Sequence, residues 1–283
     1  MYKNNYDSKF DIIKFILSIF VVLVHTNVYT KQLHPWIKIT VPMFFIIMSY
    51  FFFSKLKKVK SNKQRKDVLK IFVTRNIKLY FFWFCILIPL TLINHRNMTF
   101  DNGSVGFVTN AVQKLFLGST YMSSWFITAS IFGVIIIYFL SKKLSNKKLL
   151  FLSLFSFTFV TIWACYLPFF GSNVNRFYNT YFKVFSNPLH SFPASLIWIV
   201  VGKCFAEKTF NLSRIKSVIF FLLSFVLLYM EWIFVGSKTN FYESESYFLL
   251  LPVCISLFGF ILTIKPIKFN KSVYLKRCST VKL

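Results

Sequence analysis

Charged residues are scarce in this sequence of 283 residues: they make up 15% of it, whereas apolar residues make up 56%. A soluble domain averages about a quarter charged residues. Most of the surface is therefore expected to face something other than water. Acidic residues are the scarcest charged class, because eight Asp and Glu stand against 34 Lys and Arg, which gives a formal net charge of +26. In a soluble protein, such a charge would indicate a nucleic-acid partner.

The placement of the basic residues argues against nucleic-acid binding. They lie in short clusters between apolar stretches of about membrane-spanning length. The densest cluster has ten basic residues from Lys55 to Lys78, beside an apolar stretch. We interpret these clusters as topology signals that also contact the anionic headgroups of a lipid bilayer.

Cysteine pairs, linkers and repeats are also missing. The five cysteines form no CxxC pair, and four of them fall inside apolar stretches, so we expect packing roles and no metal site. No Pro- or Gly-rich linker and no internal repeat divides the chain. We therefore expect one domain over residues 1–283. The cysteines are Cys85, Cys165, Cys204, Cys254 and Cys278.

Eight apolar stretches are long enough to cross roughly 30 Å of hydrocarbon. They predict an all-α fold, a polytopic membrane helical bundle with about eight transmembrane helices. The first stretch follows lysines, as a secretory signal does, but it is too long and lacks a cleavage site, so we expect it to be retained. The stretches are 10–29, 36–53, 77–94, 124–140, 149–168, 190–206, 216–235 and 247–264.

The basic residues also predict the orientation of the bundle. With the N-terminus in the cytosol, 26 Lys and Arg fall on the inner side and 7 on the outer side. Cytoplasmic loops carry an excess of Lys and Arg, so this orientation is strongly favoured. We expect both termini in the cytosol and a multi-pass membrane protein. Abundant Lys, Asn, Ile and Phe indicate an AT-rich bacterial genome, so we expect the membrane to be a bacterial cytoplasmic membrane.

A polar stripe marks the first stretch. Ionisable residues inside membrane stretches are costly and usually face the bundle interior. On a helix, Lys14 and His25 lie about 20° from eclipsed and about 16 Å apart along the axis, and Asp11 and Ser18 extend the stripe. We expect it to point inward. Lys14 could instead reach the inner interface with Asp11 as its i+3 partner, and His25 could bind a loop carbonyl.

The other ionisable residues lie near the outer ends of stretches. Glu231 stands beside a tryptophan in the seventh stretch. It could reach the outer headgroups, pair with a cation or orient a histidine. We expect His34, His95 and His190 to be solvated in or beside outer loops.

These residues resemble the motifs of the integral-membrane acyltransferase family 3. The segment from Asp11 to His25 is similar to that family's opening helix, whose signature is Arg-x10-His, with Lys14 in place of the arginine. The segment from Arg75 to Lys78 looks like its Arg-x-x-Arg turn, again with lysine at the second position. Further similar segments are 41–53, 124–126, 202–207 and 275–280.

The resemblance implies an O-acyltransferase that moves an acyl group, most often acetyl, from cytosolic acetyl-CoA to a hydroxyl of an exported cell-envelope polysaccharide. Acyl-CoA would be a co-substrate, with no permanently bound cofactor. The resemblance implies that His25 is the catalytic base, as hydroxyl chemistry requires. It also implies that a cationic patch meets the CoA phosphates. That patch comprises Lys14, Arg75 and Lys78, and the candidate supporting residues are Asp11, Trp125 and Glu231.

Two alternatives remain open. Family members typically have ten helices, so the resemblance implies two further helices beyond the basic tail 265–283, and the chain could be an inactive truncated remnant or an assembly partner. Membrane domains resembling this family are also fused to serine racemases, where they are associated with D-serine movement. A transporter of that kind would be expected to show broken helices or paired half-repeats, and the sequence shows neither clearly.

Overall fold

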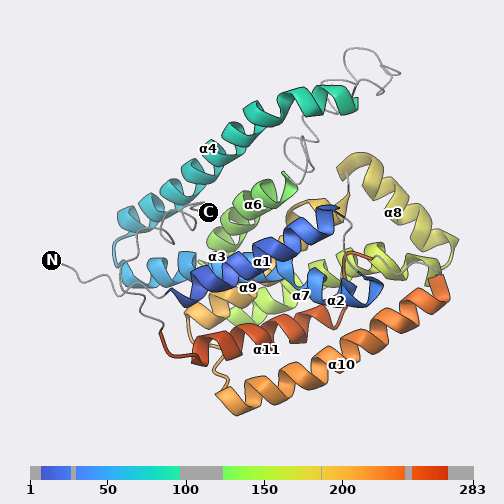
Figure 1. The fold of residues 1–283 in the computed structure, drawn as a ribbon. Coiled ribbons are helices and arrows are strands. Elements are labelled where there is room, and N and C mark those ends of the chain that lie inside the picture. The colour runs from blue at the N-terminus through green and yellow to red at the C-terminus, as the bar shows by residue number, and fades with distance from the viewer. Residues whose placement is uncertain (1–7, 27–29, 96–123, 186, 240–243, 267–283) are drawn as a thin grey trace.

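The computed structural model describes residues 8–26, 30–95, 124–185, 187–239 and 244–266. Within these ranges the protein is helical and contains no strand. The long helices run back and forth along a common direction and form a bundle (Figure 1). They are α1 (Lys9–Thr26), α3 (Thr40–Lys58), α4 (Asn62–His95), α6 (Trp125–Leu140), α7 (Asn146–Thr161), α9 (Phe192–Ala206), α10 (Arg214–Thr239) and α11 (Leu250–Thr263).

Each of these eight helices overlaps one of the apolar stretches predicted from the sequence, so an all-helical fold is confirmed for the part of the chain that the structure describes. Three helical segments are long and apolar enough to cross a membrane: Lys31–Lys58, Asn146–Phe169 and Arg214–Thr239. Three shorter helices, α6, α9 and α11, are also apolar. These segments suggest a membrane protein, while the number of spans and their orientation stay predictions.

Helix α9 is the centre of the bundle. Thirteen of its 15 residues are buried, and it packs against α3, α6 and α7. Small residues permit this close packing, as is common between membrane helices. Gly202 lies against the backbone of α3, where an added Cβ would meet the Ile46 carbonyl oxygen at 2.6 Å and would also overlap Oγ of Ser49.

Two long helices lie at the edges of the bundle. Figure 1 shows α4 along one edge and α10 along the opposite edge. Both expose large apolar side chains, among them Ile71 and Trp83 on α4 and Phe220 and Leu223 on α10. Such extended apolar faces would be unfavourable in water, and they suit contact with lipid.

The structure contains a helix that the sequence did not predict, α8 (Ser172–Phe185), which crosses one end of the bundle (Figure 1). Its apolar residues lie on one side of a largely polar segment. Tyr178 is buried and stacks on Phe159 with ring centroids 4.7 Å apart, and Phe182 stacks on Trp163 at 5.5 Å. A helix of this kind lies along a surface and does not span a bilayer.

The first and last described helices meet at the other end of the bundle. The Nζ atom of the buried Lys9 donates a hydrogen bond of 3.0 Å to the carbonyl oxygen of Ile264, just after α11. This bond satisfies a carbonyl at a helix C-terminus, where intrahelical partners are lacking. The start of α1 and the end of α11 therefore lie on one side of the bundle, as the predicted topology requires.

Candidate functional site

The cation of the polar stripe is paired within α1. Nζ of Lys14 lies 2.7 Å from Oδ1 of Asp11, in an i,i+3 ion pair. The pairing of these two residues that the sequence suggested is confirmed. Asp11 also lies in the first turn of α1, where a negative charge interacts favourably with the helix dipole.

The stripe does not point inward along its full length. Ser18 and His25 are exposed, whereas Phe10 and Leu17 occupy the buried side of α1. The inward orientation expected for Ser18 and His25 is therefore wrong. The reason is packing: Phe10 contacts the rings of Tyr50 and Phe258, so burial of apolar area fixes the rotation of α1.

His25 lies in the last turn of α1. Its neighbour Thr26 donates a hydrogen bond of 3.0 Å to the carbonyl oxygen of Val22. An exposed imidazole at a helix end is accessible to a substrate that approaches from outside the helix. Accessibility is a requirement for a proton acceptor in hydroxyl chemistry.

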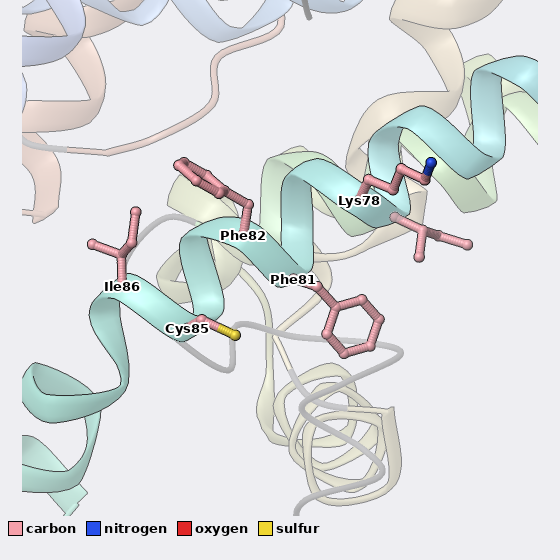
Figure 2. Close-up of a pocket in the computed structure, with 6 residues that line it drawn as sticks. Lys78, Phe81, Phe82, Cys85 and Ile86 are labelled. Carbon is pink, nitrogen blue, oxygen red and sulfur yellow. The ribbon is translucent and has the colours of Figure 1, made fainter.

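The other two predicted phosphate ligands lie on α4. Arg75 and Lys78 are exposed and three residues apart, so they project from the same side of the helix. Lys78 lines a hollow of about 570 Å³, whose described wall comes from α4 alone. Figure 2 shows Lys78, Phe81, Phe82, Cys85 and Ile86 along this wall. Helices α1 and α4 both pack against α3, which holds them in one bundle.

Glu231 has a role that the sequence did not predict. Its buried carboxylate accepts hydrogen bonds from the backbone N–H of Phe248 at 2.7 Å and of Leu249 at 2.8 Å, and from the hydroxyl of Tyr166 at 2.5 Å. It therefore caps the start of α11, where backbone donors have no intrahelical partner. Among the described residues it neither pairs with a cation nor binds a histidine, and its burial excludes the predicted contact with headgroups.

His34 was expected to be solvated, and this expectation is wrong. It lies on the short helix α2 (His34–Lys38) and is 1% exposed. Its Nε2 atom lies 2.8 Å from the carbonyl oxygen of Ser244, and its ring meets that of Tyr247 edge-on. The loop before α11 folds over α2 and excludes water, which no local sequence feature indicates.

His190 and Glu245 form a second pair that the sequence did not predict. The Nε2 atom of His190 lies 2.9 Å from Oε2 of Glu245, and the His190 ring packs against Trp125 with centroids 5.3 Å apart. The pKa of Glu245 is below its ordinary value, mainly because of this hydrogen bond; burial opposes the shift, and the charges of His190, Lys38 and His34 add to it. Trp125, a predicted supporting residue, thus contacts a histidine.

A buried lysine at the opposite end of α9 was also missed. Nζ of Lys203 lies 2.7 Å from Oε2 of Glu207 and donates a hydrogen bond of 2.6 Å to Oδ1 of Asn146. The i,i+4 spacing of Lys203 and Glu207 is a sequence signal that could have found the pair. A buried cation without partners would be strongly unfavourable, and the oxygens of Glu207 and Asn146 offset this cost for Lys203.

Some predictions fall on parts of the chain that are not described. They are the side chain of His95, Cys278, the segment 275–280 and most of the tail 265–283. Within the described ranges, Cys85 is exposed and Cys165, Cys204 and Cys254 are buried, and all four are free thiols. The same ranges contain no group of three or more His, Cys, Asp or Glu side chains that could hold a metal ion.

Comparisons with known proteins give a family and distant relatives. A family model described as an acyltransferase domain matches residues 7–281. A serine/alanine racemase of Enterococcus gallinarum is 23% identical over 77% of this chain and 30% of its own length. An amino-acid racemase of Enterococcus faecalis is 23% identical over 93% of this chain and 37% of its own length. The chain thus spans about a third of these curated relatives, and no solved structure matches it.

Proposed function

The chain belongs to the acyltransferase family 3, and on that premise we propose that it is a membrane O-acyltransferase. It moves acetyl from cytosolic acetyl-CoA to a hydroxyl of an exported cell-envelope polysaccharide. The observation that carries the proposal is the family match, which extends over almost the whole chain, from residue 7 to residue 281. The apolar helices support a membrane location, and in this proposal the membrane is the bacterial cytoplasmic membrane, which the chain crosses several times.

His25 is the proton acceptor in this proposal. It takes the proton of the acceptor hydroxyl, whose oxygen then attacks the thioester carbonyl carbon of acetyl-CoA. The new C–O bond forms as the C–S bond breaks, and the CoA thiolate leaves and takes up a proton. A positioned base of this kind contributes about 10²- to 10⁴-fold to the rate. The support for His25 is its position in the family signature and its exposure at the end of α1.

The phosphates of CoA bind a cationic patch formed by Lys14, Arg75 and Lys78. Charge-assisted hydrogen bonds to phosphate are roughly twice as strong as neutral ones. Lys14 lies eleven residues before His25 on α1, which corresponds to about 16 Å along the helix axis. The slender pantetheine arm of CoA extends over this interval from the phosphates towards His25. The lysines act as point charges, without the bidentate geometry of arginine.

The test is transfer of radiolabelled acetyl from acetyl-CoA to envelope polysaccharide in membranes that contain the full chain. Matched membranes without the chain are the control, and a series of longer acyl-CoA donors defines the donor. Label in polysaccharide that depends on the chain supports the proposal. If no fraction acquires label that depends on the chain, although the membranes contain matched amounts of protein, the proposal is contradicted.

A second candidate function is movement of a small amino acid such as serine across the membrane. The observation that favours it is that both curated relatives are named as racemases of amino acids. Uptake of radiolabelled D-serine into proteoliposomes that contain the chain tests it. Uptake above empty liposomes, without acyl transfer, would favour this candidate over the acyltransferase.

A further inference from the structure

Exposed aromatic side chains gather at the end of the bundle that α8 crosses. Phe169 and Phe170 lie just before α8, in and after the 3-10 helix η3 (Leu167–Phe169), and both are exposed. The ring of Phe169 stacks on that of Phe234, near the end of α10, with centroids 6.0 Å apart and an interplanar angle of 14°. The exposed aromatic surface beside α8 is therefore continuous with the exposed apolar face of α10.

The exposed face of α10 changes from apolar to cationic at this point. Met230, Ile233 and Phe234 are exposed, and Lys238, in the last turn of α10, is exposed four residues after Phe234. Residues four apart lie on the same side of a helix. An apolar face that ends in an aromatic residue and a cation is typical of a helix that passes from the hydrocarbon into the headgroup layer. Because Phe169 stacks on Phe234, the segment that leads into α8 lies at the level of this boundary.

Helix α8 has an aromatic flank that the bundle leaves largely uncovered. Tyr178 marks the side of α8 that faces the bundle, since it is buried and its hydroxyl donates a hydrogen bond of 2.9 Å to the carbonyl oxygen of Phe159. Phe177 lies about 100° around the helix from Tyr178 and is 61% exposed. Exposure of a phenyl ring to water is unfavourable, so this flank is suited to hydrocarbon.

The side of α8 that faces away from the bundle is polar and basic. Arg176 and Thr180 each lie two residues from Tyr178, about 160° around the helix from it, and both are exposed. The sequence has no Asp or Glu from residue 102 to residue 206, so neither α8 nor the segments that flank it carry a negative side chain. A helix with an apolar flank and a basic polar side lies in the plane of the headgroup layer, where a guanidinium binds phosphate.

We propose that α8 is embedded in the headgroup layer of an anionic phospholipid bilayer, in the leaflet at the end of the bundle opposite to Lys9. The ring of Phe177 inserts among the upper ends of the acyl chains, and the guanidinium of Arg176 donates hydrogen bonds to lipid phosphates. The stacked rings of Phe169 and Phe234 lie at the same depth. The helix thereby fixes the level of this end of the bundle in the membrane. This binding is independent of the proposed acyl transfer.

The first measurement is local exposure, in the full chain reconstituted into phosphatidylcholine liposomes. A bimane fluorophore is attached at Phe177→Cys or at Asn179→Cys in a Cys85→Ser, Cys278→Ser background, in which the other three cysteines are buried. Asn179 is the matched position, since it is exposed on the same helix about 160° from Phe177. We expect lipids with brominated acyl chains to quench the fluorophore at residue 177, and acrylamide in the water to quench the fluorophore at residue 179.

The second measurement compares headgroups with the fluorophore at residue 177. Brominated phosphatidylglycerol is expected to quench it at an about fivefold lower mole fraction than brominated phosphatidylcholine, since one basic residue near an anionic surface provides a preference of this order. Arg176→Lys is expected to keep this preference, because the positive charge stays, and Arg176→Gln is expected to remove it.

Three results would overturn the proposal. Quenching by acrylamide alone at both positions would place α8 in water. Shielding of residue 177 from acrylamide and from brominated lipid would mean that protein covers this flank, such as a second copy of the chain. An equal preference for phosphatidylglycerol in Arg176→Gln and in the chain with Arg176 would show that this side chain does not bind the lipid phosphate.

Discussion

Nζ of Lys14 lies 2.7 Å from Oδ1 of Asp11, one turn earlier on α1. The cation that the proposed reaction assigns to a CoA phosphate is therefore paired with a carboxylate in the structure without ligand. The lysine side chain is 31% exposed, so a phosphate can compete with Asp11 for it. A partly exposed i,i+3 pair within one helix contributes little to stability, so a doubly charged phosphate can replace Asp11 as the partner of Lys14.

Lys14→Met is expected to raise the KM for acetyl-CoA about 10- to 100-fold. The reason is the loss of one hydrogen bond between charged groups, which contributes about 1.5–3 kcal/mol. Asp11→Asn is the matched variant, and it is expected to leave this KM unchanged or to lower it, because it removes the competing carboxylate. Steady-state kinetics over a range of acetyl-CoA concentrations check both. An unchanged KM in Lys14→Met would refute the phosphate role of Lys14.

Cys85 offers a direct probe of the hollow beside Lys78. The two residues are seven apart on α4, so they lie within about 20° on one face and about 10 Å along the axis. Cys85 is exposed, whereas the other three described cysteines are buried. In a Cys278→Ser background, we expect acetyl-CoA to slow the alkylation of Cys85 by N-ethylmaleimide several-fold, as followed by mass spectrometry.

Lys78→Ala is the companion variant for this measurement. In Lys78→Ala, the protection of Cys85 by acetyl-CoA is expected to disappear, because the phosphate contact is lost. The rate of Cys85 alkylation without acetyl-CoA is expected to stay the same. Protection that persists in Lys78→Ala would mean that CoA reaches the hollow without Lys78. Equal alkylation with and without acetyl-CoA in the parent chain would place CoA elsewhere.

Glu231→Gln is expected to lower the free energy of unfolding by about 1–3 kcal/mol. The carboxamide has one acceptor oxygen, so a buried backbone N–H at the start of α11 loses its partner. Tyr166→Phe removes one hydroxyl donor and is expected to have a smaller effect. Thermal unfolding in detergent at a fixed scan rate measures both. Ser237→Ala, an exposed substitution on the same helix, is the control. An unfolding midpoint of Glu231→Gln equal to that of the wild-type chain would exclude the capping role.

Gly202→Ala is expected to destabilise the bundle by about 1–3 kcal/mol, because the added methyl group would overlap the backbone of α3. The Ile46 carbonyl oxygen at 2.6 Å and the Tyr50 nitrogen at 2.9 Å are backbone atoms and cannot rotate away. Gly171→Ala is the control, since nothing lies within 4 Å of its added Cβ. Thermal unfolding midpoints compare the two. Equal midpoints would show that α3 and α9 are not closely packed.

The sequence predicted the eight long helices because each has a continuous apolar stretch. It missed α8 because Ser172–Phe185 has many polar residues, so that only the arrangement of its aromatic residues marks it as amphipathic. The ion pair between Lys14 and Asp11 was predictable because both residues lie within one turn of a helix. The spacing of residues along the sequence therefore predicts the long helices and the contacts within a single helix.

Contacts between distant segments were not predictable. Glu231 lies 17 residues from Phe248, and His34 lies 210 residues from Ser244. Only the fold brings these groups together, and it buries both side chains. The predicted rotation of α1 was also wrong. The polar stripe suggested that its own side faces inward, whereas burial of the apolar area of Phe10 and Leu17 stabilises the opposite rotation. The roles of His25, Arg75 and Lys78 rest on the family signature and stay predictions.

The most direct test of the acyltransferase proposal compares acetyl transfer to polysaccharide by wild-type chain, His25→Ala and Thr26→Ala at matched amounts in membranes. Thr26 is the exposed neighbour of His25 in the last turn of α1, so its variant controls for disturbance of the helix end. We predict wild-type transfer in Thr26→Ala and a loss of at least about 100-fold in His25→Ala. Equal transfer by His25→Ala and wild-type chain would contradict the assignment of His25 as the catalytic base.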